Sequence, residues 1–127
     1  METKKILLAD DENSIVQIMA AKLRNNCFEV VTADNGKDAF KLCCEQKPDI
    51  VVVDCELPEL SGVELAEKIH KKNGLAEVVI IMITTKETEL NAEQAEKAGI
   101  TECLNKPFSP KELLTRIENV LASATTK

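Results

Sequence analysis

Aromatic residues are almost absent from this chain of 127 residues, which has no Trp or Tyr and only three Phe residues. A hydrophobic core must therefore be built from Val, Ile, Leu and Ala, which suits the buried strands of a parallel α/β sheet. Positive charge is also scarce, since 16 Lys and Arg residues face 22 Asp and Glu residues. Binding to nucleic acid needs clustered Lys and Arg, so we expect no direct nucleic-acid contact and protein partners instead.

Long apolar runs are missing too, so no segment is suited to span a bilayer, and residues 1–5 lead into an expected strand rather than a signal sequence. The five cysteines include no C-x-x-C pair and no metal-ligand spacing, and we interpret them as reduced structural thiols. These features predict a cytoplasmic domain without membrane contact. We assign residues 1–127 to a single domain, with a tail or linker stub from about residue 122.

Short apolar runs alternate with segments of helical periodicity along the whole chain. Residues 50–53 are β-branched and apolar without interruption, which is typical of a strand buried on both faces. We expect strands at residues 4–9, 27–32, 50–53, 78–83 and 100–104, and helices at residues 13–25, 37–46, 62–72, 88–98 and from Pro110 onward. Such alternation requires parallel pairing with right-handed crossovers. The sequence therefore predicts a flavodoxin-like α/β fold, a doubly wound sheet of five parallel strands in the order 2-1-3-4-5 with five helices on its two faces.

Polar residues follow the expected strands where each strand ends. They are Asp10 and Asp11 after the first strand, Asp54 after the third, Thr84 after the fourth and Lys106 after the fifth. Taken singly, Asp10 or Asp11 reads as a helix cap and Lys106 as a solvated lysine. Because the carboxyl ends of parallel strands share one edge of the sheet, we expect the acids to converge at the switch point between the first and third strands.

Carboxylates held close together repel each other by about 4 kcal/mol per pair at 4 Å and an effective dielectric near 20. A divalent cation would offset this repulsion, and carboxylate oxygens with room for water ligands favour Mg²⁺. The hydroxyl of Thr84 and the amine of Lys106 would then face a tetrahedral oxyanion beside Asp54. This arrangement predicts phosphoryl transfer, with the carboxylate of Asp54 as the nucleophile.

These residues resemble the receiver domain of bacterial two-component response regulators over almost the whole chain. The matching marks are Asp10-Asp11, Asp54 with Leu57-Pro58 and Gly62 after it, Thr84, and Lys106-Pro107-Phe108. The resemblance implies that Asp54 accepts a phosphoryl group from a phosphohistidine on a histidine kinase or a histidine phosphotransfer protein. Such a domain is not a conventional enzyme, since it catalyses its own phosphorylation and dephosphorylation.

The resemblance also implies roles for individual residues. The implied ligands of Mg²⁺ are Asp11, Asp54 and the backbone carbonyl of Glu56, with Asp10 acting largely through water. Thr84, Lys106 and the backbone N–H of Thr85 would bind the phosphoryl oxygens. The Lys106-Pro107 peptide bond is expected to be cis, which is uncommon even before proline.

Two positions depart from the family pattern. Receiver domains commonly carry Tyr or Phe three residues before the lysine, an aromatic side chain that swings inward on activation, whereas this chain has Cys103. A thiol at this switch position lacks the bulk for such a movement, so we expect output to run through the loop after Thr84 and the fourth helix. The second departure is Glu56, which places an anion near the acceptor and would alter the lifetime of the acyl phosphate.

Partner surfaces and alternative functions complete the prediction. The surface formed by residues 88–98, residues 100–104 and the last helix resembles the face through which receivers meet an output domain, a downstream protein or a second copy of themselves. One alternative is a pseudo-receiver that binds partners without being phosphorylated. A less favoured one is a phosphatase of the haloacid dehalogenase type. Such enzymes carry a second aspartate where this chain has Glu56, and they add a cap domain that this chain lacks.

Overall fold

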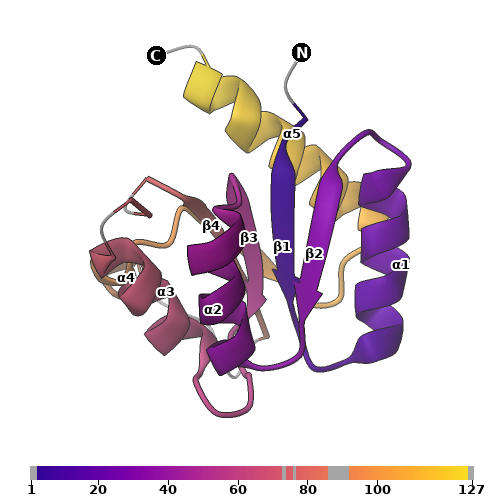
Figure 1. The fold of residues 1–127 in the computed structure, drawn as a ribbon. Helices are drawn as coiled ribbons and strands as arrows, with labels where there is room; N and C mark the ends of the chain where they lie inside the picture. Colours follow the sequence, from indigo (N-terminus) through magenta and orange to yellow (C-terminus); the bar gives the residue numbers. More distant parts are fainter. Residues whose placement is uncertain (1–2, 73, 76, 86–91, 126–127) are drawn as a thin grey trace.

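The structure is a computed structural model, and it describes residues 3–72, 74–75, 77–85 and 92–125. Strands and helices alternate from β1 to α5 (Figure 1). The strands are β1 (Lys5–Ala9), β2 (Glu29–Ala33), β3 (Ile50–Asp54), β4 (Val79–Thr84) and β5 (Glu102–Asn105). The helices are α1 (Asn13–Arg24), α2 (Gly36–Gln46), α3 (Gly62–Lys71), α4 (Ala92–Ala98) and α5 (Pro110–Thr125).

Within the described residues, the strands form one parallel sheet in the order β2-β1-β3-β4-β5, which confirms the predicted topology. β1 pairs with β2 on one side and with β3 on the other, so the winding direction of the chain reverses there. In Figure 1, α2 and α3 lie in front of the sheet and α5 lies behind it. The doubly wound fold therefore has its switch point between the ends of β1 and β3.

Apolar side chains cover both faces of the sheet. The residues of β3 from Ile50 to Val53 are each at most 2% exposed, as their β-branched run predicted. One face, which includes Leu8, packs against α1 and α5. The opposite face, which includes Leu7, packs against α2, α3 and α4. Successive residues of a strand point to opposite faces of the sheet. Because helices cover both faces here, the strands need uninterrupted runs of apolar residues.

β5 begins later than predicted, at Glu102, because the chain at Ile100 still closes α4. Gly99 has a φ of +78°, a left-handed conformation that glycine adopts without strain. The N–H of Ile100 donates to a carbonyl in the last turn of α4 at 2.9 Å, a common way to end a helix. The predicted start of this helix near residue 88 lies outside the described residues.

α5 extends to Thr125, where the sequence analysis expected a tail from about residue 122. Val120 is buried and Leu121 packs against the core, so the apolar face of the helix reaches almost to its end. Ala122 then continues the helix readily, because alanine has the highest helix propensity. None of the described helices is both long enough and apolar enough to cross a membrane. The assignment of the whole chain to a single domain stays a prediction.

Two glycines hold the loop between β3 and α3 against its neighbours. A Cβ atom at Gly62 would lie 2.3 Å from the carbonyl oxygen of Asp54, and one at Gly36 would lie 2.1 Å from that of Leu60. Such close backbone packing excludes any larger residue. The loop ends in a capping box, in which the hydroxyl of Ser61 accepts from the N–H of Glu64 and the Glu64 carboxylate accepts from the N–H of Ser61. The backbone after Asp54 is thus fixed on two sides.

The cysteines differ widely in exposure, and all five are free thiols. Cys27 is exposed, whereas Cys43 on α2 is completely buried against the sheet. Burial, with a smaller contribution from neighbouring Cys44, raises the pKa of the Cys43 thiol to about 12. Because the thiolate is the reactive form, Cys43 should be inert in the folded protein.

We expect a maleimide at neutral pH to modify Cys27 within minutes and to leave Cys43 unmodified until the protein unfolds. Timed labelling followed by peptide mass spectrometry measures both positions. A Cys27→Ser variant, in which Cys43 should stay protected, is the control. Labelling of Cys43 in the folded protein at the rate of Cys27 would contradict the packing of α2 against the sheet.

Candidate functional site

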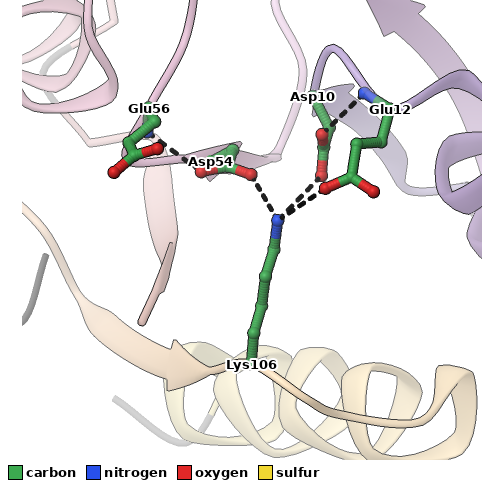
Figure 2. Close-up of polar contacts among 5 residues, drawn as sticks. All are labelled: Asp10, Glu12, Asp54, Glu56 and Lys106. Carbon is green, nitrogen blue, oxygen red and sulfur yellow. Dashed lines mark hydrogen bonds and ion pairs between the residues drawn. The ribbon is translucent and has the colours of Figure 1, made fainter. Parts of the chain in front are cut away.

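Side chains from three strand ends meet at the carboxyl edge of the sheet. Asp10 follows β1, Asp54 ends β3 and Lys106 follows β5. The Nζ atom of Lys106 lies 2.6 Å from Oδ2 of Asp54, 3.4 Å from Oε1 of Glu12 and 3.9 Å from Oδ2 of Asp10. Figure 2 shows the tip of Lys106 between these carboxylates. The structure therefore brings together three of the predicted site residues, Asp10, Asp54 and Lys106.

Each aspartate also accepts a hydrogen bond from the backbone two residues later. The N–H of Glu12 donates to Oδ1 of Asp10, and the N–H of Glu56 donates to Oδ1 of Asp54, both at 2.9 Å. Asp10 is 4% exposed and Asp54 is 7% exposed, so these N–H groups replace water that burial removes. With Oδ1 of each aspartate held by its own loop, Oδ2 is directed toward Lys106.

The charges in this cluster shift the pKa values of two groups. The pKa of Asp10 is raised overall, mainly because the carboxylate is buried, and the negative charge of Asp54 adds to this effect. The hydrogen bond from the N–H of Glu12 and the ammonium of Lys106 lower the pKa of Asp10, but they do not cancel the increase. Burial lowers the pKa of Lys106, but the hydrogen bond to Asp54 and the charges of Asp10, Asp54 and Glu12 outweigh burial and raise the pKa overall. Lys106 is therefore a stable ammonium at neutral pH.

A hollow of about 400 Å³ opens beside Asp54. The lining residues that bear on the chemistry are Asp11, Glu12, Asp54, Glu56, Thr85 and Lys106. Three predicted metal ligands, Asp11, Asp54 and Glu56, thus line the same space, and so does Thr85, for which we predicted a backbone role. The Lys106-Pro107 peptide bond is cis, as the family resemblance implied.

Thr84 lies at the end of β4 but turns its hydroxyl away from this hollow. Its side chain is 1% exposed and is not among the described residues that line the space beside Asp54. The Oγ1 of Thr84 donates instead to Oδ1 of Asn105, and the backbone carbonyl of Thr84 accepts from the N–H of Lys106 at 2.7 Å. Cys103, the predicted switch position, is partly buried on the sheet face that packs against α2, α3 and α4.

Sequence analysis missed two residues that contact this cluster. Glu12 adds a third carboxylate near the ammonium of Lys106, and it is the last of the three consecutive acids that follow β1. Asn105 engages the hydroxyl of Thr84 and precedes Lys106 in the sequence. The register of parallel strands could have indicated Asn105, because it lies opposite Thr84 across β4 and β5.

The donor set of the hollow suits a hard cation. Of the described residues that line it, four are acids (Asp11, Glu12, Asp54 and Glu56) and one, Lys106, is a cation. Across the described part of the chain, no three Asp, Glu, His or Cys side chains are grouped closely enough to hold a metal as they stand. The ammonium of Lys106 takes the position between Asp10 and Asp54 instead. Negative charge still exceeds positive charge, and oxygen donors of this kind fit Mg²⁺.

Comparison with known proteins decides the family. The family model described as the response regulator receiver domain matches residues 6–118. The chain belongs to the response regulator receiver family. This receiver is 36% identical over 121 residues to the phosphate regulon transcriptional regulatory protein PhoB of Pseudomonas aeruginosa, covering 95% of this chain and 53% of PhoB. It spans about half the length of the curated relatives it matches.

Solved structures agree with this assignment. The receiver superimposes on the chemotaxis response regulator CheY4 of Vibrio cholerae with a TM-score of 0.87 and 28% identity, covering 94% of this chain and 99% of that one. It also matches the receiver domain of the sensor histidine kinase PA1611 from Pseudomonas aeruginosa, with a TM-score of 0.81 and 27% identity over 93% of this chain and 97% of that one. The PA1611 structure is described with a magnesium ion coordinated in its active site cleft.

We expect Asp10→Asn to raise the free energy of unfolding at neutral pH, without metal, by about 1 kcal/mol. Because folding raises the pKa of Asp10, its ionised form opposes folding above that pKa, while below the ordinary value of 3.8 the protonated form does not. The advantage of the variant should therefore shrink as the pH falls toward about 4. Urea unfolding of both proteins between neutral pH and about pH 4 measures this difference in stability. Asp34→Asn, at an exposed position, is the control. A less stable Asp10→Asn protein at neutral pH would contradict the burial argument.

Proposed function

We propose that Asp54 is the phosphoacceptor of this receiver domain and that the domain is a signalling switch in a two-component phosphorelay. The observation that carries the proposal is the 2.6 Å contact between Nζ of Lys106 and Oδ2 of Asp54, two residues that line a hollow together with Asp11. This contact places a nucleophilic carboxylate beside a cation that can stabilise a developing charge. Membership of the receiver family supports the same reading.

The transfer itself needs little beyond positioning and charge. An oxygen of Asp54 attacks the phosphorus of a phosphohistidine, the P–N bond breaks as the P–O bond forms, and the electron pair stays on the donor imidazole. The N–H of Glu56 holds the carboxylate in place, and the ammonium of Lys106 compensates the charge on the phosphoryl oxygens. The N–H of Thr85 and the hydroxyl of Thr84 would bind the remaining phosphoryl oxygens.

Magnesium is the cofactor that fits the donor set. Asp11, Asp54 and the backbone carbonyl of Glu56 would hold it, with Asp10 acting through water. When bound, the ion neutralises charge between the acceptor and the incoming phosphoryl group. The magnesium described in the cleft of the PA1611 receiver supports the same assignment here.

The phosphodonor we propose is a histidine kinase or a histidine phosphotransfer protein, in the cytoplasm. Output would pass to an attached domain, a downstream protein or a second copy through the face formed by α4, β5 and α5. PhoB is named a transcriptional regulatory protein, and this chain spans about half of it, which is consistent with an output carried elsewhere. Cys103 lies at the proposed switch position and lacks the bulk for an aromatic rotamer switch.

Neither alternative function gains support. A pseudo-receiver has no need for an intact set of Asp10, Asp11, Asp54, Thr84 and Lys106, which this chain retains. The haloacid dehalogenase alternative needs a second catalytic acid two residues after Asp54. The carboxylate at that position belongs to Glu56, whose side chain is exposed while its N–H is bonded to Asp54.

Acetyl phosphate with Mg²⁺ should add one phosphoryl group to the protein, and Asp54→Asn should abolish the addition because no other carboxylate is paired with Lys106 at 2.6 Å among the described residues. Intact-protein mass spectrometry before and after hydroxylamine, which cleaves acyl phosphates, measures it. Asp34→Asn is the matched control and should be phosphorylated like the wild type. A phosphoryl group retained by Asp54→Asn, or none in the wild type, would refute the acceptor assignment.

Lys106→Met keeps the length of the side chain and removes its charge, so the carboxylates lose their resident cation. We expect Mg²⁺ to bind about tenfold more tightly, because one positive charge no longer competes for the acids. Phosphorylation by acetyl phosphate should slow by about a hundredfold, as happens when one stabilising donor is lost.

Calorimetric titration with Mg²⁺ and the rate of mass gain measure these two effects of Lys106→Met separately. Lys111→Met, on an exposed part of α5, is the control and should change neither. Weaker Mg²⁺ binding by Lys106→Met would show that the lysine does not compete with the metal.

A further inference from the structure

The end of β5 holds Thr84 at two points. Thr84 and Asn105 are paired across β4 and β5, and the Oγ1 of Thr84 donates to Oδ1 of Asn105. The N–H of Lys106, the next residue, donates to the carbonyl of Thr84 at 2.7 Å. One bond comes from the last residue of β5 and the other from the residue after it, which is the lysine paired with Asp54. Any movement of Thr84 toward the hollow must therefore disturb β5.

We propose that Asn105 is a positioning residue that keeps the hydroxyl of Thr84 out of the acceptor hollow until Asp54 is phosphorylated. The side-chain carbonyl of Asn105 and the phosphoryl oxygens compete for the same hydroxyl proton. The inference rests on the proposed function, because it needs a phosphoryl group on Asp54.

The chemistry of the two acceptors sets the direction of this exchange. Asn105 offers a neutral amide oxygen, whereas a phosphoryl group offers charged oxygens that form stronger hydrogen bonds. In the unmodified protein, the oxygens of Asp54 accept from the N–H of Glu56 and the ammonium of Lys106, whereas the hydroxyl of Thr84 donates to Asn105. Asn105 therefore retains Thr84 in the unmodified protein and loses it in the phosphorylated one.

The exchange also links a buried event to the protein surface. Thr84 is buried, whereas Asn105 is exposed at the end of β5. Cys103 and Asn105 lie on the same face of β5, because residues two apart on a strand point the same way. Release of the Asn105 amide changes the polar groups presented by β5, in a chain where Cys103 is too small to act as an aromatic switch.

A double-mutant cycle between positions 84 and 105 tests the proposal. Asn105→Leu removes the acceptor with little change in size, and Thr84→Val removes the hydroxyl. The probe is beryllofluoride with Mg²⁺, which mimics the acyl phosphate, and its affinity is measured by titration of amide NMR signals. Asn119→Leu, on an exposed part of α5, is the matched control.

We expect Asn105→Leu to bind beryllofluoride about fivefold more tightly than the wild type, because the competing hydrogen bond is gone. In the Thr84→Val background the same change should alter the affinity by less than about twofold, because no hydroxyl is left to release. A purely structural role for Asn105 would produce equal changes in both backgrounds, and this result would overturn the proposal. Failure of the wild type to bind beryllofluoride would instead refute the proposed function.

Discussion

The buried carboxylates of Asp10, which follows β1, and Asp54, which ends β3, lie close together, and their mutual repulsion must be offset by a cation for this edge of the sheet to be stable. Lys106 supplies that charge from β5, although β4 separates β5 from β3. The extended side chain of Lys106, which reaches from its backbone to the carboxylates, makes this possible (Figure 2). The ammonium contacts Asp54, Glu12 and Asp10 together, so removal of any one acid changes the electrostatics of the others. The site is therefore one coupled unit.

The backbone around Asp54 is constrained as strongly as its charge. Gly62 lets the first turn of α3 approach the carbonyl of Asp54, and Gly36 lets the start of α2 approach Leu60. The N–H of Gly36 also donates to the carbonyl of Pro58 at 3.1 Å. The loop that carries Glu56 is thus held from both ends, while the contacts of Thr84 lie on the other side of Asp54, with β5.

Much of this arrangement can be predicted from the sequence, because the positions of the strands and of their polar ends depend on local residue patterns. The apolar run that ends at Asp54 identifies a buried strand and its polar end, and the same reasoning places Asp10 and Lys106 at one edge. The hydrogen bond from Thr84 to Asn105, in contrast, could not be predicted from a local pattern. It depends on the register between two strands that are separated by a helix, which no local pattern specifies. The helical end of α5 was missed because Ser and Thr residues, which are common at helix ends and in turns, follow the last large apolar residue of this segment.

The start of β1 and the end of α5 lie at the upper edge in Figure 1, whereas the arrows of β2 and β3 point to the lower edge. Asp54 is the last residue of β3 and therefore lies at the lower edge. α5 begins at Pro110 beside the site and runs back along the sheet, so the full length of the helix separates Asp54 from Thr125. A tether or fusion partner joined at either terminus would therefore be attached at the edge of the sheet opposite to Asp54.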